Sequence, residues 1–433
     1  MRQTLFYLPE TLFGVPLFGF GIFFWVAFVF TVVMIVVRVR KHGMDQEAWG
    51  YLPMFVIVAA LIVYVVPHVL TPDGFPIRGY GTFLLFAIVA AVGLLMYRAK
   101  KLWNIPQDTI ISLSLWCVIC GLVGARLFYV IQYWANIRKP DLPATLFSIV
   151  SISEGGLVVY GSIIGGTLGA TVFLMKNNLP VLATLDLLAP ALLLGCAIGR
   201  IGCLMNGCCF GGVSDLPWAV TFPPGSPVHY HQLHHQQTYF GGLKFREDSS
   251  RIRIDEVQPG SEAEKLGLKK EMTILALGLK VADQDQLVPV KENHHLFDFI
   301  DQAIHGHLQE ILIVTDSPPP FHRYTLPLKS QEVLPVHPTQ IYSSLDAAFG
   351  CVLLLVCSRF CKKDGQVFLL LMIYYPIARF ILEIIRTDED SFLETGLTIS
   401  QNVSLLTLGG AVILGIYLAH RSTGREYQVR KEK

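Results

Sequence analysis

The chain has 433 residues, of which 52% are hydrophobic and only 15% are charged, and its mean hydropathy is +0.50. Water-soluble domains carry about a quarter charged residues, so this composition excludes an ordinary soluble protein and indicates a membrane protein. The formal net charge of +1 excludes a global basic surface of the kind that binds nucleic acid, and we expect no nucleic-acid partner.

About nine apolar segments are long enough to cross a bilayer, which takes about 20 residues. They lie at residues 11–38, 51–70, 77–97, 108–133, 155–175, 182–205, 342–359, 365–386 and 399–419. The first has neither a basic leader nor a clear cleavage site, so we expect it to be retained as an anchor. The predicted fold class is an all-α polytopic membrane protein with one small α/β extracytoplasmic domain.

Basic residues gather on one side of this predicted bundle. They follow the first, third, fifth and seventh segments and fill the tail, at residues 38–41, 98–101, 176, 359–363 and 421–433. The positive-inside rule places that side in the cytoplasm, with the N-terminus outside and the C-terminus inside. Arg138 and Lys139 are the exception on the outer side.

A short repeat marks the starts of the first and third segments, because Gly14–Gly21 reads like Gly74–Gly81. The second copy has Arg78 and Tyr80 where the first has phenylalanines. We interpret this as a duplicated helix start whose first copy has lost its polar groups. Only the second copy is therefore expected to line a site.

A polar insertion, residues 207–336, separates the sixth and seventh segments and begins as a loop rich in Pro, Gly and His. From about Phe240 its pattern predicts a small α/β module. We expect strands at 251–257 and 310–314, a short helix after the turn at 258–261, and a second helix at 295–303.

This module, about residues 239–330, resembles the PDZ family through residues 257–264 and through a loop at 239–243. PDZ modules bind extended peptides by adding a strand to a sheet edge, so the resemblance implies a peptide ligand. A rigid spacer that binds nothing is the alternative, and the sequence does not separate the two.

Two arginines interrupt apolar segments. Arg200 ends the sixth segment and Arg379 lies in the eighth, and a guanidinium does not lose its proton. Placing it at membrane depth costs several kcal/mol unless an anion or carbonyls meet it. The pair predicts a grip on a phosphate-bearing lipid. Snorkelling of Arg200 toward headgroups, and a buried ion pair of Arg379 with Glu383, are the alternatives.

Other small and polar motifs interrupt the apolar segments in a fixed order. They are Gly124-Ala125-Arg126, Glu154 to Ser162, Gly199 to Gly211, His337-Pro338-Thr339-Gln340-Ile341-Tyr342, and Tyr375 with Arg379, Glu383 and Arg386 at helical spacing. From Ile77 to about Leu418 this ordered set resembles the prolipoprotein diacylglyceryl transferase family.

The resemblance implies a seven-helix inner-membrane core and a reaction. The diacylglyceryl group of phosphatidylglycerol moves to the lipobox cysteine of a bacterial prelipoprotein, which forms a thioether and releases glycerol phosphate. No cofactor is implied. The expected domains are two additional helices (1–72), a first core part (73–206), the insertion (207–336), a second core part (337–420) and a basic cytoplasmic tail (421–433).

Carried over residue by residue, the resemblance implies four catalytic residues, Arg200, Arg379, Tyr160 and Tyr80. The substrate-binding residues that we expect are Tyr375, Asn206, Gly211, His337, Gln340, Tyr342, Glu383, Arg126, Cys208 and Cys203.

The chain also departs from the family pattern. Tyr160 stands where the family has a histidine proposed as proton acceptor, Cys203 and Cys208 stand for a signature asparagine and glutamate, and Ser343 for a further glutamate. These departures leave the phosphate grip in place and affect the proton-handling part.

The chemistry suits two fixed cations. The attacking sulfur belongs to the substrate, and its thiol, with a pKa of about 8.5, must become a thiolate. Cations lower that pKa and stabilise charge on the departing phosphate. Tyr160 then serves as a hydrogen-bond donor, or less well as a base.

Three cysteines, Cys203, Cys208 and Cys209, precede four histidines, at 229, 231, 234 and 235. Cys and His together are zinc or copper ligands in principle, but the spacing matches no standard finger. A disulfide is a second alternative. We favour packing or lining of a lipid pocket, and expect no metal.

A second function class stays open, namely a non-catalytic membrane protein that binds or senses peptides on a transferase-like scaffold. An intramembrane protease would need an H-E-x-x-H or G-x-S-G motif. The sequence contains neither.

Overall fold

The computed structural model describes residues 4–43, 46–71, 74–139, 141–150, 156, 158–248, 251–281, 284–289, 300, 310–316, 322–327, 332–386 and 396–421. The chain divides into two compact units. The first comprises residues 1–83 with 205–207, and the second residues 84–204 with 208–433.

The first unit holds two helices and short strands. Strand β1 (Thr4–Leu8) pairs antiparallel with β4 (Phe75–Arg78), and β2 (Thr11–Leu12) forms a hairpin with β3 (Val15–Pro16). Helix α1 (Ile22–His42) packs on α2 (Gln46–Ala60), which continues as a π-helical turn (Leu61–Val65) and a 3₁₀ turn (Val66–His68). Phe55 of α2 lies between two phenylalanine rings of α1, Phe24 at 5.8 Å and Phe28 at 5.7 Å.

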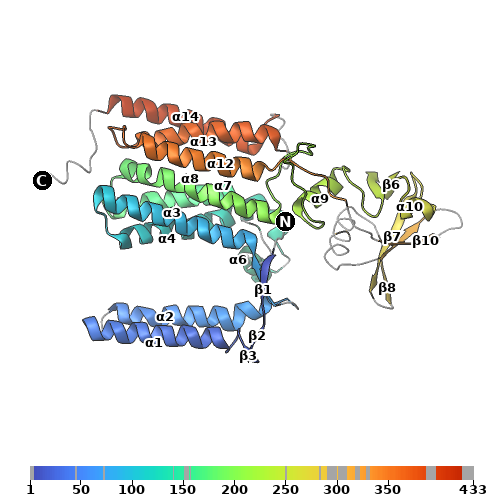
Figure 1. Ribbon diagram of the computed structural model, residues 1–433, viewed down its shortest axis with the longest axis horizontal. Helices are drawn as coiled ribbons and strands as arrows, with labels where there is room; N and C mark the ends of the chain where they lie inside the picture. Colours follow the sequence, from blue (N-terminus) through green and yellow to red (C-terminus); the bar gives the residue numbers. More distant parts are fainter. Residues whose placement is uncertain are drawn as a thin grey trace. The chain divides into compact units, whose positions relative to one another are not determined.

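Seven further long helices correspond to the third to ninth predicted segments, as α1 and α2 correspond to the first two. They are α3 (Gly79–Trp103), α4 (Gln107–Gln132), α7 (Val159–Lys176), α8 (Val181–Asn206), α12 (Thr339–Cys357), α13 (Gln366–Ile385) and α14 (Ile399–His420) (Figure 1). Among the described residues, eight helices are long and apolar enough to cross a membrane, and α7 is shorter. The predicted polytopic helical class is therefore confirmed.

Two short helices, α5 (Trp134–Ile137) and α6 (Leu142–Val150), follow α4 and were not predicted. With nine residues α6 is too short to span a bilayer. Arg126 of α4 holds the end of α6 in place. Its Nε donates to Ile149 O at 2.9 Å, and its Nη2 donates to Ser148 O at 2.6 Å. These are carbonyls of the last turn of α6, which lack partners within the helix.

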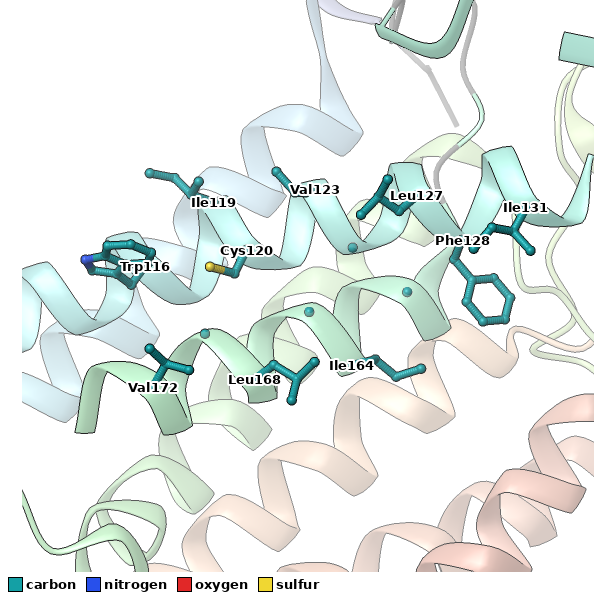
Figure 2. A pocket seen from close by; sticks show the side chains of 14 residues that line it. Trp116, Ile119, Cys120, Val123, Leu127, Phe128, Ile131, Ile164, Leu168 and Val172 are labelled. Carbon is teal, nitrogen blue, oxygen red and sulfur yellow. The ribbon is translucent and has the colours of Figure 1, made fainter. Parts of the chain in front are cut away.

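Helices α4 and α7 approach closely because glycines face each other. A Cβ on Gly161 would lie 2.3 Å from Gly124 O, and one on Gly165 would lie 2.2 Å from Cys120 O. Small residues allow such close backbone approach in membranes, where packing drives helix association. An apolar groove of about 500 Å³ lies along this seam. Figure 2 shows side chains of both helices that line it, among them Leu127 of α4 and Leu168 of α7.

Helix α8 lies at the centre of the second unit, with Ala183, Leu187 and Leu193 almost fully buried. Pro190 has no N–H, so the carbonyl of Asp186 lacks its helical partner. Arg98 of α3 supplies one, with Nη1 at 3.3 Å from Asp186 O. The Asp186 carboxylate then accepts from Gly365 N and another N–H at the start of α13, both at 2.8 Å. An anion at a helix N-terminus is stabilising, so one residue ties three helices together.

The insertion holds a six-stranded antiparallel sheet in the order β10-β9-β7-β6-β5, with β8 paired to β7. The strands are β5 (Leu243–Asp248), β6 (Arg251–Val257), β7 (Thr273–Val281), β8 (Gln284–Pro289), β9 (Glu310–Thr315) and β10 (His322–Pro327). The strands predicted at 251–257 and 310–314 are confirmed, as is the short helix, α10 (Glu262–Lys265). The helix predicted at 295–303 lies outside the described residues except for Ile300.

The sequence predicts that the insertion begins as a loop, and the structure corrects this prediction. The segment contains helix α9 (Pro227–His234). Ser226 caps this helix by accepting from His229 N, and Pro227 fits its first turn. Gln232 of α9 pairs with the backbone of Leu334 through both amide atoms, at 2.9 and 3.0 Å. The outgoing and returning chains of the insertion are thus joined near their attachment to the helices.

Candidate active site

Arg200 is half-buried near the end of α8 and faces α13. Its side chain lies within hydrogen-bonding range of the Tyr375 side chain, and Arg379 interacts electrostatically with the same phenol. The structure therefore brings the two predicted cations to one place. Tyr375 keeps 37% of its surface exposed, so this place is open to the outside of the helix bundle.

Glu383 is buried and lies between Arg379 of α13 and Arg386, the residue that follows this helix. Its Oε2 pairs with Nη1 of Arg379, one turn before it, and with Nη1 of Arg386 at 3.4 Å. Arg379 Nη2 also donates to Ser400 Oγ at 2.8 Å, and Ser400 is buried near the start of α14. The predicted ion pair of Arg379 with Glu383 is present, and it lies in the same cluster as Arg200.

The two kinds of arginine differ in their surroundings. Arg379 and Arg386 share one carboxylate. The groups that interact most strongly with Arg200 are Cys209, Tyr375 and Cys203, together with the like charge of Arg386. None of these is a carboxylate. Arg200 is thus the cation of this described cluster that is best placed to meet an external anion.

The chain turns sharply after α8. Gly207 has a positive φ of 77°, and Cys208 N donates to Cys203 O at 3.2 Å. Cys209 also lies in the left-handed region, with φ 59°, a conformation that costs a non-glycine residue about 1–2 kcal/mol.

Two buried side chains of α12 hold this turn. Gln340 Nε2 donates to Cys208 O and Thr339 Oγ1 donates to Cys209 O, each at 2.7 Å. Only 1% of Gln340 and none of Thr339 is exposed. The His-Pro-Thr-Gln element therefore fixes the backbone beside Arg200.

Gly211 lies where this loop meets α12 and α13. Its N–H donates to His337 O at 3.0 Å, and it forms an isolated bridge with Arg386. A Cβ on Gly211 would lie 2.7 Å from His337 Cβ and 3.0 Å from Ile385 O. Any side chain here would push apart the segments that carry Arg386 and Gln340.

The three cysteines of this turn converge. The sulfur atoms of Cys203, Cys208 and Cys209 lie within 4.8 Å of one another, and none of the three forms a disulfide. The pKa of the Cys209 thiol lies below its ordinary value, because the Cys203 and Cys208 thiols hydrogen-bond to it and Arg200 and Arg386 stand close. Among the described residues, no histidine belongs to this group.

The four histidines at 229, 231, 234 and 235 lie in and just after α9 instead. His229 is fully buried, and its Nδ1 accepts from Gly225 N at 3.1 Å. Burial lowers the pKa of His229 to about 4. His231 and His235 stack with ring centroids 4.2 Å apart.

Other predicted site residues lie in different surroundings. Tyr342 Oη accepts from Trp218 Nε1 at 2.7 Å and lies 3.5 Å from His337 Nδ1. Arg126 holds α6 and stacks on the Tyr129 ring, 5.2 Å from its centroid. The described contacts of Arg126 are with α6, Gly156 and Tyr129, and they include none of the residues described around Arg200.

Three more predicted residues have fewer described contacts. Tyr80 lies in the first turn of α3 with 43% of its surface exposed, and Asn206 is the last residue of α8. Tyr160 belongs to the first turn of α7, and its side chain lies outside the described residues.

The site residues predicted from the sequence do not include several members of this cluster. Arg386 was seen at helical spacing after Arg379 and Glu383, but it was not named as a site residue. Thr339 and Ser400 were also missed, because a hydroxyl gives no signal until the fold brings a partner to it. Cys209 could have been found from its place beside Cys208.

Known proteins share this chain's pattern. A model of the family described as prolipoprotein diacylglyceryl transferase matches residues 67–244 and 297–417. A phosphatidylglycerol–prolipoprotein diacylglyceryl transferase of Rhodopirellula baltica is 34% identical over 95% of this chain and 88% of its own length. The same-named protein of Clostridium tetani is 38% identical over 38% of this chain and 64% of its own, and that of Trichormus variabilis is 37% identical over 34% and 50%. The chain belongs to the prolipoprotein diacylglyceryl transferase family.

Proposed function

We propose that this chain transfers the diacylglyceryl group of phosphatidylglycerol to the lipobox cysteine thiol of bacterial prelipoproteins. A thioether forms, and glycerol phosphate leaves. The observation that carries the proposal is Arg200, a cation at the end of an apolar helix whose strongest interactions include no carboxylate. An anionic phosphate supplies the missing counter-charge. The relatives' names and the family match support the same reaction.

The reaction displaces a phosphate from carbon. The substrate thiolate donates an electron pair to the glyceryl carbon, the carbon–oxygen bond to the phosphate breaks, and the phosphate oxygen keeps the pair. Arg200 interacts with the phosphate in a bidentate manner and stabilises the negative charge that grows on it. Tyr375, which lies within hydrogen-bonding range of Arg200 and interacts electrostatically with Arg379, adds a hydroxyl beside that charge.

The remaining residues divide into two roles in this proposal. We assign Arg379, Tyr80, Tyr160 and Asn206 to binding of the lipid or the peptide. Gln340, Gly211, His337 and Tyr342 fix the loop after α8, and Cys203 and Cys208 form its inner surface. Glu383 orients Arg379 and Arg386 through the buried pairs. Arg126 acts indirectly, since its guanidinium donates to carbonyls of Ser148, Ile149 and Gly156.

We place the protein in the bacterial cytoplasmic membrane, with the N-terminus outside and the C-terminus in the cytoplasm. Basic residues at 38–41, 98–101 and 359–363 support this orientation. It assigns the C-terminal end of α8, with Arg200 and the turn after it, to the outer leaflet. That is where the thiol of a translocated prelipoprotein arrives.

A direct assay tests the proposal. The purified chain, in nanodiscs that contain phosphatidylglycerol, is incubated with a lipobox peptide, and the peptide mass is measured. We expect the peptide to gain one diacylglyceryl group, and nanodiscs of phosphatidylcholine alone to give none. A folded protein that leaves the peptide mass unchanged would support the second reading, a sensing protein on a transferase-like scaffold.

We further propose that the insertion is PDZ-like and binds an extended peptide. β5 is an edge strand of the described sheet, and Gly241 and Gly242, which precede it, both have positive φ. An edge strand offers free backbone groups for an added strand. Gln236 Nε2 donates to Phe245 O at 3.0 Å, so the incoming peptide displaces that one contact.

Peptide binding by the insertion is measurable on the full chain. We expect some members of a library of extended peptides to bind, and replacement of Phe245 by proline to abolish that binding by removing a strand N–H. Replacement of the exposed Lys269, on the turn before β7, is the control. A library without a single binder would favour the rigid spacer.

A further inference from the structure

The turn after α8 gathers three thiols into one small volume. The sulfur atoms of Cys203, Cys208 and Cys209 all lie within 4.8 Å of one another. Thiolates bound to one zinc ion at 2.3 Å in tetrahedral geometry lie about 3.8 Å apart. Small side-chain rotations separate the two arrangements, so the three sulfurs are already placed as ligands of one ion.

The backbone is built to keep the sulfurs there. Cys209 has a left-handed φ, and Thr339 and Gln340 hold its carbonyl and that of Cys208 from buried positions. Strained backbone persists where surrounding contacts over-determine it, and it clusters at functional sites. A cysteine that only fills space in an apolar core needs neither the strain nor these bonds.

The donor set selects the kind of ion. Three sulfurs without a described histidine or carboxylate form a soft site, and thiolates select zinc or copper(I) over magnesium or calcium. A divalent ion with three thiolates has a formal charge of −1, which is 2 minus 3. Arg200 and Arg386 lie close to this group. With Arg379 they carry three positive charges against one negative charge on Glu383 and one on the ion group, so one positive charge remains for the lipid phosphate.

A disulfide would use the thiols differently. Three cysteines cannot all pair within one chain, so one would be left over. In the structure none of the three forms a disulfide. The convergence of all three sulfurs therefore favours one shared ion over one bonded pair.

We propose that Cys203, Cys208 and Cys209 bind Zn²⁺ and leave it one coordination position for a substrate thiol. Three protein ligands with one open position are the arrangement of catalytic zinc sites. The position lies beside Arg200, where the proposed function brings the lipobox thiol, and in that respect the inference rests on the proposed function. A thiol that binds zinc gives its proton to solvent and remains as thiolate. Its electron pair is then available for the attack on carbon.

This role answers a need of the described cluster. Its side chains are arginines, a tyrosine, thiols and a glutamate held between two arginines. The arginines, the tyrosine and the paired glutamate are poor bases for a thiol at neutral pH, and the cysteines serve as metal ligands in this proposal. A bound ion supplies the thiolate without one.

A measurement of metal content tests whether the three cysteines bind zinc, and it requires no diacylglyceryl transfer. We expect the full chain, purified without chelator, to contain about one zinc per chain, and Cys203→Ser, Cys208→Ser and Cys209→Ser each to lose most of it. Cys357→Ser, at the end of α12, is the matched control and keeps it. Absence of zinc, copper in its place, or a disulfide between two of the three cysteines in the mass spectrum would overturn the site.

Cobalt substitution tests the open position. Co²⁺ bound to thiolates gives sulfur-to-cobalt absorption, which grows with the number of bound thiolates. We expect that rise on adding a lipobox peptide, and no rise with the same peptide carrying serine for cysteine. If the cysteine peptide leaves the absorption unchanged, the proposal of an open coordination position is overturned. Both readouts are independent of diacylglyceryl transfer, so they succeed or fail separately from the proposed function.

Discussion

Replacement of Arg200 by lysine is expected to lower kcat/KM for diacylglyceryl transfer by about 10²–10³-fold, while the fold stays intact. Lysine keeps the charge but loses the planar fork that binds two phosphate oxygens at once. Removal of one preorganised donor to a developing anion costs about this much in well-studied enzymes. Arg200→Ala, which removes charge and fork together, is expected to be inactive.

The matched control is Arg40→Lys, on an exposed position near the end of α1. It should leave kcat/KM unchanged. Each variant's thermal unfolding in the same micelles shows whether the loss is chemical or structural. Arg200→Lys with full activity would mean that Arg200 only reaches toward lipid headgroups, as the snorkelling alternative holds.

Replacement of Glu383 by glutamine is expected to destabilise the chain by about 3–5 kcal/mol. The carboxylate is buried between Arg379 and Arg386, whose side chains are only 12% and 5% exposed. Breaking a buried pair from one side leaves uncompensated charge, and that accounts for the size of the loss. The free energy of unfolding can be measured by titrating SDS into mixed micelles and following tryptophan fluorescence.

Glu256 provides the comparison, because it pairs with Lys244 at 2.8 Å on the exposed surface of the insertion. Exposed ion pairs contribute little to stability, so Glu256→Gln should unfold like the parent. Equal behaviour of the two variants would show that Glu383 does not stabilise the arginines. Double replacement of Arg379 and Glu383 should recover part of the stability that Glu383→Gln loses.

Much of the fold could be predicted because each of its causes is local in the sequence. Within the part of the chain that the structure describes, each of the nine predicted apolar segments corresponds to a helix. The ends are displaced by a few residues except for α1, which begins at Ile22 after a short strand hairpin. The strand at 251–257 follows from its period-two pattern. Helix α9 was missed because its caps, Ser226 and Pro227, were read only as turn residues.

Long-range contacts could not be predicted in the same way. The contact of Arg98 with the carbonyl of Asp186, which loses its helical partner because of Pro190, joins residues 88 positions apart. The spacing of Tyr375, Arg379 and Glu383 did place them on one face of a helix. It did not show that Arg200 would lie beside Tyr375, nor that Thr339 and Gln340 would hold the turn at Cys209.

The cysteines illustrate the same limit. Their spacing matches no known finger, so the sequence favoured packing. Their convergence depends on two positive-φ residues, Gly207 and Cys209, which a spacing rule does not describe. The histidines, which the sequence offered as partners, are held in and around α9 by contacts of their own.

The central claim, that the α8–α13 cluster holds the lipid phosphate, can be tested by photolabelling. A phosphatidylglycerol with a photoreactive headgroup is cross-linked to the full chain in nanodiscs, and the labelled peptides are identified by mass spectrometry. We expect label within residues 196–211 and 375–386, and competition by unlabelled phosphatidylglycerol but not by phosphatidylcholine. Label confined to the groove between α4 and α7, or to the insertion, would contradict the account.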